Sequence, residues 1–253
     1  MLSSMAIRCI TFDWGDTLAA NYGMPYLATQ RSAFGRLAID LHNAGCEVPA
    51  DFMQQCMKAL AVQWKSSIDP LLNPEHREFD FQAMISSWVA TTVGPAAEHV
   101  AVQGAVERCK DRLCDTVLPF TESAPTLAAL KAKGLRLGIL SHVPWPGDAC
   151  RRWFARHGLA EHLDFYSLSS EIGWIKPNPL HFTDALRQSG VLAHEILHVG
   201  DHPMRDVEGA RRAGFRTCLR WTECLYPEES LHQAAADVTI LQLHELTAVV
   251  DQL

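Results

Sequence analysis

The pattern of hydrophobic and polar positions changes twice along the chain. Residues 6–12 form a short apolar run rich in β-forming side chains, which predicts a buried strand. From about residue 24 to residue 118, apolar positions recur three and four residues apart. This spacing predicts a block of amphipathic helices, over residues 25–45, 50–69, 79–94 and 96–115.

After residue 119 the pattern alternates between short apolar runs and amphipathic segments. We expect strands at 135–142, 165–170, 195–201, 215–221 and 237–240, with helices between and after them. Such alternation is typical of a parallel sheet with helices on both faces. The sequence therefore predicts an α/β protein with a doubly wound, Rossmann-like core made of residues 1–19 and 119–253. The helical block, residues 20–118, is then an inserted domain.

Composition and charge narrow the possible functions. The chain has 253 residues, 48% hydrophobic and 20% charged, which is ordinary for a globular protein. Its formal net charge of -7 disfavours nucleic acid or an anionic membrane as a partner. No apolar run approaches the roughly 18 residues of a membrane span. The eight cysteines form no CxxC pair, and we expect them to be reduced in a cytoplasmic protein.

Polar side chains with useful chemistry follow the predicted strands. In doubly wound sheets, ligands bind outside the carboxyl ends of the strands. Asp13, Ser141 and Asp201 lie at such ends, and Lys176 follows another strand. Mg²⁺ favours one or two carboxylates together with substrate oxygens, and a hydroxyl and an ammonium group suit a phosphate. This edge of the sheet is therefore predicted to bind Mg²⁺ and a phosphate group.

Four segments in register carry a family resemblance that spans nearly the whole chain. They are FDWGDTL (12–18), LGILSHV (137–143), EIGWIKPNPLHF (171–182) and HVGDHPMRDVEGARRAG (198–214). The set resembles the haloacid dehalogenase-like superfamily, in particular its helical-cap branch, because the helical block lies between the first and second segments. The resemblance implies an Mg²⁺-dependent phosphatase that forms an aspartyl-phosphate on a small phosphorylated metabolite. It also implies that the helical block is a cap domain.

The resemblance assigns catalytic roles to four residues. Asp13 would be the nucleophile that attacks phosphorus, and Thr17 occupies its usual place in the nucleophile loop. Ser141 would donate a hydrogen bond to a phosphoryl oxygen. Lys176 would steady both the nucleophile and the charge of the phosphate.

The resemblance also implies a magnesium site. Asp13, Asp201 and the backbone carbonyl of Gly15 would hold the ion. Asp206 would support the site from behind.

Gly15 departs from the family pattern and leaves three interpretations open. Family phosphatases have there an Asp that protonates the leaving oxygen, whereas here Gly15 and Asp16 have exchanged places. The protein could be a phosphatase in which Asp16, His142 or a water replaces that carboxylate. It could instead be a carbon–halogen hydrolase, since the dehalogenases of the superfamily lack the same Asp. It could also bind phosphate and metal without turnover. Asp201 and Asp206 favour phosphoryl chemistry, because dehalogenases need no metal.

The residues that determine substrate specificity are harder to identify from the sequence. We interpret His142 and Trp145, which follow Ser141, as candidate substrate contacts. Conceivable contributors from the inserted domain are Asn21, Tyr22, Arg31, Trp64 and Arg77. We expect a monomer or a homodimer.

The segment His194–His198 matches the HExxH pattern of zinc proteases. That chemistry requires both histidines on one face of a helix, and the predicted strand over 195–201 argues against it.

Overall fold

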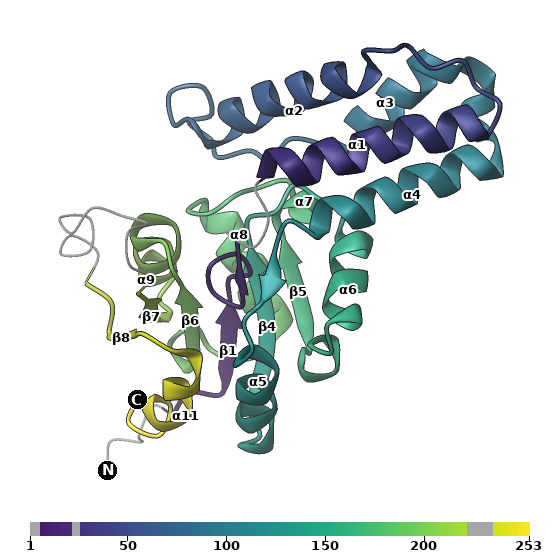
Figure 1. The fold of residues 1–253 in the computed structure, drawn as a ribbon. Coiled ribbons are helices and arrows are strands. Elements are labelled where there is room, and N and C mark those ends of the chain that lie inside the picture. The colour runs from purple at the N-terminus through teal and green to yellow at the C-terminus, as the bar shows by residue number, and fades with distance from the viewer. Residues whose placement is uncertain (1–5, 22–25, 222–234) are drawn as a thin grey trace. The chain divides into compact units, whose positions relative to one another are not determined.

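A six-stranded parallel sheet forms the centre of the fold (Figure 1). The structure is a computed structural model that describes residues 6–21, 26–221 and 235–253. The strands are β1 (Cys9–Phe12), β4 (Arg136–Ser141), β5 (Phe165–Leu168), β6 (Ile196–Gly200), β7 (Arg216–Arg220) and β8 (Val238–Ile240). They are ordered β5-β4-β1-β6-β7-β8, and every neighbouring pair is parallel. The predicted α/β fold with a parallel sheet is confirmed.

Helices lie on both faces of this sheet (Figure 1). They are α5 (Ser123–Ala132), α7 (Ser169–Ile172), α8 (Pro179–Ser189), α9 (Gly209–Arg212) and α11 (Leu246–Val249). Helix α8 packs on β4, β5 and α9, whereas α5 packs on β4 and α11. Single turns lie between them, at η2 (Ala160–His162), η3 (Ala193–Glu195), η4 (Pro203–Glu208) and η5 (Leu243–Glu245). Among the described helices none has the length and apolarity that a bilayer crossing requires.

Burial on both faces explains why the central strands are continuous apolar runs. All four residues of β1 are buried, as are the last five of β4. Gly138 in β4 allows the ring of Phe165 to approach, because a Cβ atom there would lie 2.3 Å from the ring. Leu140 and Phe182 belong to the same core cluster. The strand ends are thereby held rigidly at one edge of the sheet.

The chain divides into two compact units. The first comprises Met1–Ala20, Pro119–Val143 and Ala155–Leu253, and the second Asn21–Leu118 and Pro144–Phe154. The chain leaves the first unit after β2 (Ala19–Ala20) and returns at β3 (Leu118–Pro119). The second unit is helical, with α1 (Tyr26–Asn43), α2 (Phe52–Ile68), α3 (Phe81–Val93), η1 (Gly94–Glu98) and α4 (Val100–Cys114).

Residues 144–154 belong to the second unit, whereas the sequence pattern grouped them with the rest of 119–253. Most of them form α6 (Gly147–Arg156), which therefore spans the boundary. Trp145 packs edge-on against Phe81, with ring centroids 5.1 Å apart. The Arg152 guanidinium pairs with carboxylates of α4. These contacts are formed with side chains that precede residue 118, and the amphipathic pattern of α6 alone does not reveal them.

The seven described cysteines are buried free thiols. Burial raises the pKa of Cys9 and of Cys218 to about 12. Cys224 lies outside the described residues. The described thiols are therefore packing residues, as their apolar surroundings in the sequence predict.

Candidate active site

The register of the sheet brings the predicted strand-end residues to one edge. Phe12 at the end of β1 is paired with Ile139 of β4 and with Val199 of β6. Beyond these paired residues, each of the three strands leads to a residue with a polar side chain. These residues are Asp13 after β1, Ser141 at the end of β4 and Asp201 after β6.

The loop after Asp13 is tight and carries one unusual backbone conformation. The carbonyl of Trp14 accepts hydrogen bonds from the N–H groups of Leu18 and Ala19, at 2.9 and 3.0 Å. Asp16 has a φ of 56°, in the left-handed region that favours glycine. The exchange of Gly and Asp therefore has two consequences. It leaves position 15 without a side chain, and it puts a residue with a Cβ atom in a left-handed conformation.

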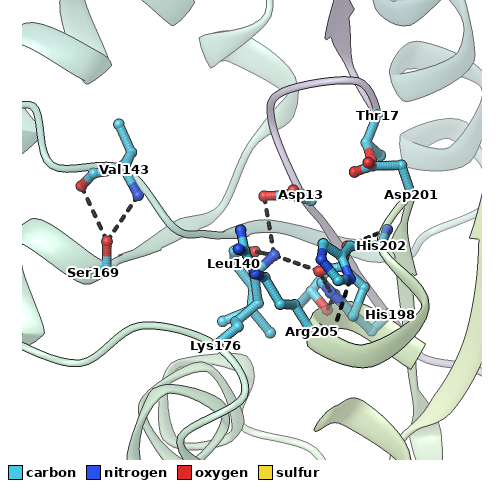
Figure 2. Close-up of polar contacts among 12 residues, drawn as sticks. Asp13, Thr17, Leu140, Val143, Ser169, Lys176, His198, Asp201, His202 and Arg205 are labelled. Atoms are coloured by element: carbon cyan, nitrogen blue, oxygen red, sulfur yellow. Dashed lines mark hydrogen bonds and ion pairs between the residues drawn. The ribbon is translucent and has the colours of Figure 1, made fainter. Parts of the chain in front are cut away.

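Lys176 joins two carboxylates in the interior of the site (Figure 2). Its ammonium group lies 3.0 Å from Asp13 Oδ1 and 2.5 Å from Asp206 Oδ1, and it donates to the Leu140 carbonyl at 3.0 Å. The Lys176 side chain is only 1% exposed. Burial alone would lower the pKa of Lys176, but the Asp13 and Asp206 charges outweigh it and the pKa is raised. Lys176 is therefore a fixed positive charge beside Asp13.

Asp206 is held by donors on both carboxylate oxygens. Its Oδ1 accepts from Lys176 and from His198 Nε2, the latter at 3.2 Å, and its Oδ2 accepts from the His202 N–H at 2.9 Å. Burial opposes ionisation, but the Lys176 charge and the His198 hydrogen bond hold the pKa of Asp206 far below its usual range. Gly200 permits this packing, because a Cβ atom there would lie 2.2 Å from Asp206 Cγ.

Three carboxylates form a group that fits a divalent cation. Asp13, Asp201 and Asp206 each offer one oxygen, and these atoms lie within 4.8 Å of one another. The Thr17 hydroxyl donates to Asp201 Oδ1 at 3.4 Å. A set of carboxylate oxygens is the donor chemistry that Mg²⁺ prefers. Because Asp206 already accepts three hydrogen bonds, it is better placed to support the metal site than to bind the ion directly.

The segment after β4 is fixed by a second hydroxyl. Ser169 Oγ accepts from the Val143 N–H at 2.8 Å and donates to the Val143 carbonyl at 3.1 Å (Figure 2). Ser141 is buried and His142 is half-buried. The backbone that carries both side chains is thus anchored within two residues of Ser141.

His202 is a residue whose role the sequence did not reveal. Its Nδ1 accepts from the N–H groups of Met204 and Arg205, at 3.2 and 3.3 Å, and so caps η4 (Figure 2). Burial, together with the Arg205 charge, lowers the pKa of His202 to about 4. The ring is therefore neutral near pH 7, with its proton on Nε2.

Sequence reasoning also missed His198 and Arg220. The Thr11 hydroxyl lies 2.9 Å from His198 Nδ1, so His198 connects β1 to Asp206. The HExxH pattern obscured this role, but His194 lies in η3 and His198 in β6, which excludes a shared helix face. Arg220 donates to the carbonyls of Asp16 and Thr17. It ends β7, and the strand-end rule could have identified it.

The remaining candidates lie in the second unit or outside the described residues. Trp145 is 4% exposed and packs against Phe81, and a contact with substrate stays a prediction. Arg31 is exposed, as is Arg77, whose guanidinium pairs with Glu75. Asn21 and Trp64 are partly buried, and Tyr22 lies outside the described residues.

The chain is similar in sequence to known hydrolases. The family model of the haloacid dehalogenase-like hydrolases matches residues 7–214. A glyceraldehyde 3-phosphate phosphatase from Methanopyrus kandleri is 35% identical over 49% of this chain and 53% of its own length. A phosphoserine phosphatase from Thermus thermophilus is 36% identical over 50% of this chain and 49% of its own. The chain thus spans about half the length of these curated relatives.

Solved structures share the fold over nearly the whole chain. A haloacid dehalogenase-like phosphatase from Thermococcus onnurineus superposes with a TM-score of 0.63, at 18% identity, over 96% of this chain and 98% of its own. A 2-haloacid dehalogenase from Pseudomonas syringae superposes with a TM-score of 0.62, at 26% identity, over 97% of this chain and 99% of its own. With the family model covering most of the sequence, this chain belongs to the haloacid dehalogenase-like hydrolases.

Proposed function

We propose that the protein hydrolyses a small phosphomonoester with Mg²⁺, through an aspartyl-phosphate on Asp13. The observation that carries this proposal is the buried Lys176, which lies between Asp13 and Asp206, two of the three clustered carboxylates. Such a group combines a carboxylate nucleophile, a fixed cation and oxygen donors for a metal. The curated phosphatase relatives support the same reaction class.

In the first step an Asp13 carboxylate oxygen attacks phosphorus, and the bond between phosphorus and the leaving oxygen breaks. Lys176, 3.0 Å from Asp13 Oδ1, stabilises the charge on the phosphoryl oxygens. Ser141 donates a hydrogen bond to one of those oxygens. The leaving oxygen departs as an alcohol once it takes up a proton.

In the second step water attacks phosphorus, the bond between phosphorus and Asp13 breaks, and phosphate leaves. Mg²⁺, when bound, supplies charge stabilisation at the phosphoryl group. Asp13, Asp201 and the Gly15 carbonyl would hold it. Asp206 would keep Lys176 and the segment after β6 in place through its three hydrogen bonds.

Position 15 has no carboxylate that could donate a proton to the leaving oxygen. Asp16, His142 or a water takes this role in our proposal. A positioned acid or base is worth about 10²–10⁴-fold in rate, so its replacement decides how well poor leaving groups are expelled. The helical unit would act as a cap that excludes water and selects small substrates.

A second candidate function is hydrolysis of a carbon–halogen bond. The missing side chain at position 15 and the similarity to a solved 2-haloacid dehalogenase favour it. The three clustered carboxylates argue against it, because a halide leaves without metal assistance. A role in binding phosphate and metal without turnover is the third candidate.

The test measures release of phosphate from a panel of aryl and sugar phosphates, with and without Mg²⁺. A parallel assay measures release of halide from a 2-haloacid. Asp13→Asn is the matched variant, because it keeps the shape of the side chain and removes its nucleophilic charge. We expect Mg²⁺-dependent phosphate release that Asp13→Asn abolishes. Halide release without metal would establish the dehalogenase instead. Binding of Mg²⁺ and phosphate without either product would establish the binding role.

A further inference from the structure

The loop between Asp13 and Thr17 needs an external support because it contains the most flexible residue type next to a strained one. Gly15 has more accessible backbone conformations than any other residue type. Asp16, which follows it, has a φ of 56°, a conformation that costs a residue with a Cβ atom about 1 kcal/mol. Lys176 contacts the Asp13 carboxylate at the start of this loop, and a restraint on the peptides after Asp16 holds its other end.

Arg220 supplies such a restraint from the end of β7. Its Nη1 donates to the carbonyl of Asp16 at 2.9 Å and to the carbonyl of Thr17 at 3.0 Å. Arg220 is only 7% exposed. The Asp16–Thr17 and Thr17–Leu18 peptide groups are therefore held by one buried, permanently charged side chain, over a separation of more than 200 residues in sequence.

The guanidinium group is itself held in place. Its Nη2 donates to Glu122 Oε1 at 3.3 Å, and its central carbon lies 3.9 Å from the centroid of the Phe120 ring. Glu122 in turn accepts from the Leu243 N–H at 3.0 Å and pairs with His244 at 3.3 Å. A planar group fixed on three sides positions the carbonyls that it binds.

The next carbonyl of the loop is also restrained. The Leu18 carbonyl accepts from Ser123 Oγ at 2.7 Å and from the Phe120 N–H at 3.1 Å. Three successive carbonyls, from residue 16 to residue 18, are thus hydrogen-bonded to Arg220 or to the start of α5. The end of the loop is anchored in this way, and its middle is closed by the Asp16 N–H, which donates to the Ala19 carbonyl at 2.6 Å.

We propose that Arg220 is a positioning residue, which fixes the Asp16–Thr17 and Thr17–Leu18 peptides and so helps to hold Asp13 and Thr17 in reactive geometry. This inference rests on the proposed phosphatase function for its kinetic consequence, but its structural consequence is independent of any activity. A displacement of about 1 Å in a reacting group can cost about 10²-fold in rate.

The test compares Arg220→Lys and Arg220→Gln with the natural protein in two measurements. Hydrogen exchange of the peptide over residues 13–20 should become about tenfold faster or more in Arg220→Gln, since a charged hydrogen bond is lost. Exchange in β4 and β6 should stay unchanged. On an aryl phosphate, kcat should fall about 10- to 100-fold while KM changes less than about twofold. Lysine keeps the positive charge but lacks the several N–H donors of the guanidinium. Loop exchange and kcat of Arg220→Lys should therefore lie between those of the natural protein and those of Arg220→Gln.

Two further measurements separate positioning from a general loss of structure. Added guanidinium ion should restore part of kcat to Arg220→Ala, which a merely structural role would not allow. Arg136→Lys is the matched control, because the Arg136 guanidinium also donates to a backbone carbonyl, that of Gln188. Arg136 begins β4, at the end of the strand opposite to Ser141. Arg136→Lys should leave both loop exchange and kcat unchanged. If the Arg220 variants do not fold, Glu122→Gln loosens the same guanidinium and should accelerate loop exchange.

Unchanged loop exchange in folded Arg220→Gln, or in Glu122→Gln where the Arg220 variants do not fold, overturns the inference. Faster exchange together with unchanged kcat also overturns it, because the loop would then not control Asp13. Absence of phosphate release from the natural protein contradicts the proposed function alone. In that case the exchange measurement still decides whether Arg220 holds the loop.

Discussion

The ammonium group of Lys176 lies 3.0 Å from Asp13 Oδ1, on a side chain that is almost fully buried. A buried ion pair is costly to break from one side, because the remaining charge loses its partner without regaining water. Lys176 has two such partners, Asp13 and Asp206. Its charge therefore contributes to the stability of this edge of the sheet, and in the proposed function it would also control the reactivity of Asp13.

Lys176→Met should destabilise the protein by about 3–5 kcal/mol and abolish turnover. The substitution leaves the carboxylates of Asp13 and Asp206 close together without the cation that they share. The double variant Lys176→Met/Asp206→Asn should lose less stability than the sum of the two single variants, because one of the opposed charges is then gone. Urea unfolding of the three variants measures this difference. Additive losses would show that the Lys176–Asp206 pair contributes no coupling.

Gly200→Ala should reduce both stability and turnover, because its Cβ atom would meet Asp206 Cγ at 2.2 Å. Overpacking of this kind costs about 1–3 kcal/mol, and displacement of Asp206 should lower kcat by about 10²-fold. Gly104→Ala is the matched control, since its Cβ atom would meet only the flexible end of Arg108 at 3.3 Å. In the α4 helix this change should be neutral or stabilising by up to about 1 kcal/mol. Thermal unfolding and kcat check both variants, and equal effects would contradict the prediction.

Acid should destabilise the protein through His181, which is fully buried on α8. Burial, together with the Lys176 charge, lowers the pKa of His181 to about 3, and its Nε2 donates to the Ser167 carbonyl at 3.1 Å. Between pH 6.5 and about 3 the unfolded chain binds a proton that the folded chain does not. Stability from this group is therefore fully present above pH 6.5 and is lost as the pH falls.

Urea unfolding at pH 7 and pH 5 measures the effect. The natural protein should lose about 2 kcal/mol more stability over this interval than His181→Gln, in which the buried imidazole is absent. Contributions from the carboxylates are common to both proteins and cancel in the comparison. His194→Gln, at an exposed position, should behave like the natural protein. An equal pH dependence in His181→Gln would contradict the prediction.

Restoring the usual order of Gly and Asp should improve catalysis with poor leaving groups. The double variant Gly15→Asp/Asp16→Gly puts a carboxylate at position 15 and a glycine at the left-handed position 16. Hydrolysis of sugar phosphates should rise by about 10²–10⁴-fold, whereas hydrolysis of an aryl phosphate should change much less. Steady-state kinetics on both substrates check this. Equal changes for the two would show that another group already supplies the proton.

The sequence predicted those features that depend on local pattern. Alternating apolar runs located the parallel sheet, and the strand-end rule located Asp13, Ser141 and Asp201 at one edge. Lys176 is different, because it follows the short helix α7 rather than a strand directly. Its position at the same edge was nevertheless expected from the strand-end rule, and the family resemblance added the expected contact with Asp13.

Features that depend on pairing between distant residues could not be predicted. Arg220 binds the carbonyl of Asp16, and Thr11 binds His198, and nothing in the local pattern of either segment indicates its partner. The helical segment between the predicted strands at 195–201 and 215–221 begins with the wider turn η4. His202 caps this turn and the Asp206 side chain bonds back to the His202 N–H, contacts that periodicity does not encode.

The proposed function depends on covalent phosphorylation of Asp13, and rapid acid quenching of a reaction detects this intermediate. The protein is mixed with Mg²⁺ and an aryl phosphate, quenched, digested and analysed by mass spectrometry. Since position 15 lacks the side chain that would activate water, the intermediate should accumulate. The account predicts one phosphoryl group on the peptide that contains Asp13, absent in Asp13→Asn. Phosphate release without any modified Asp13, or a phosphoryl group on another residue, would contradict it.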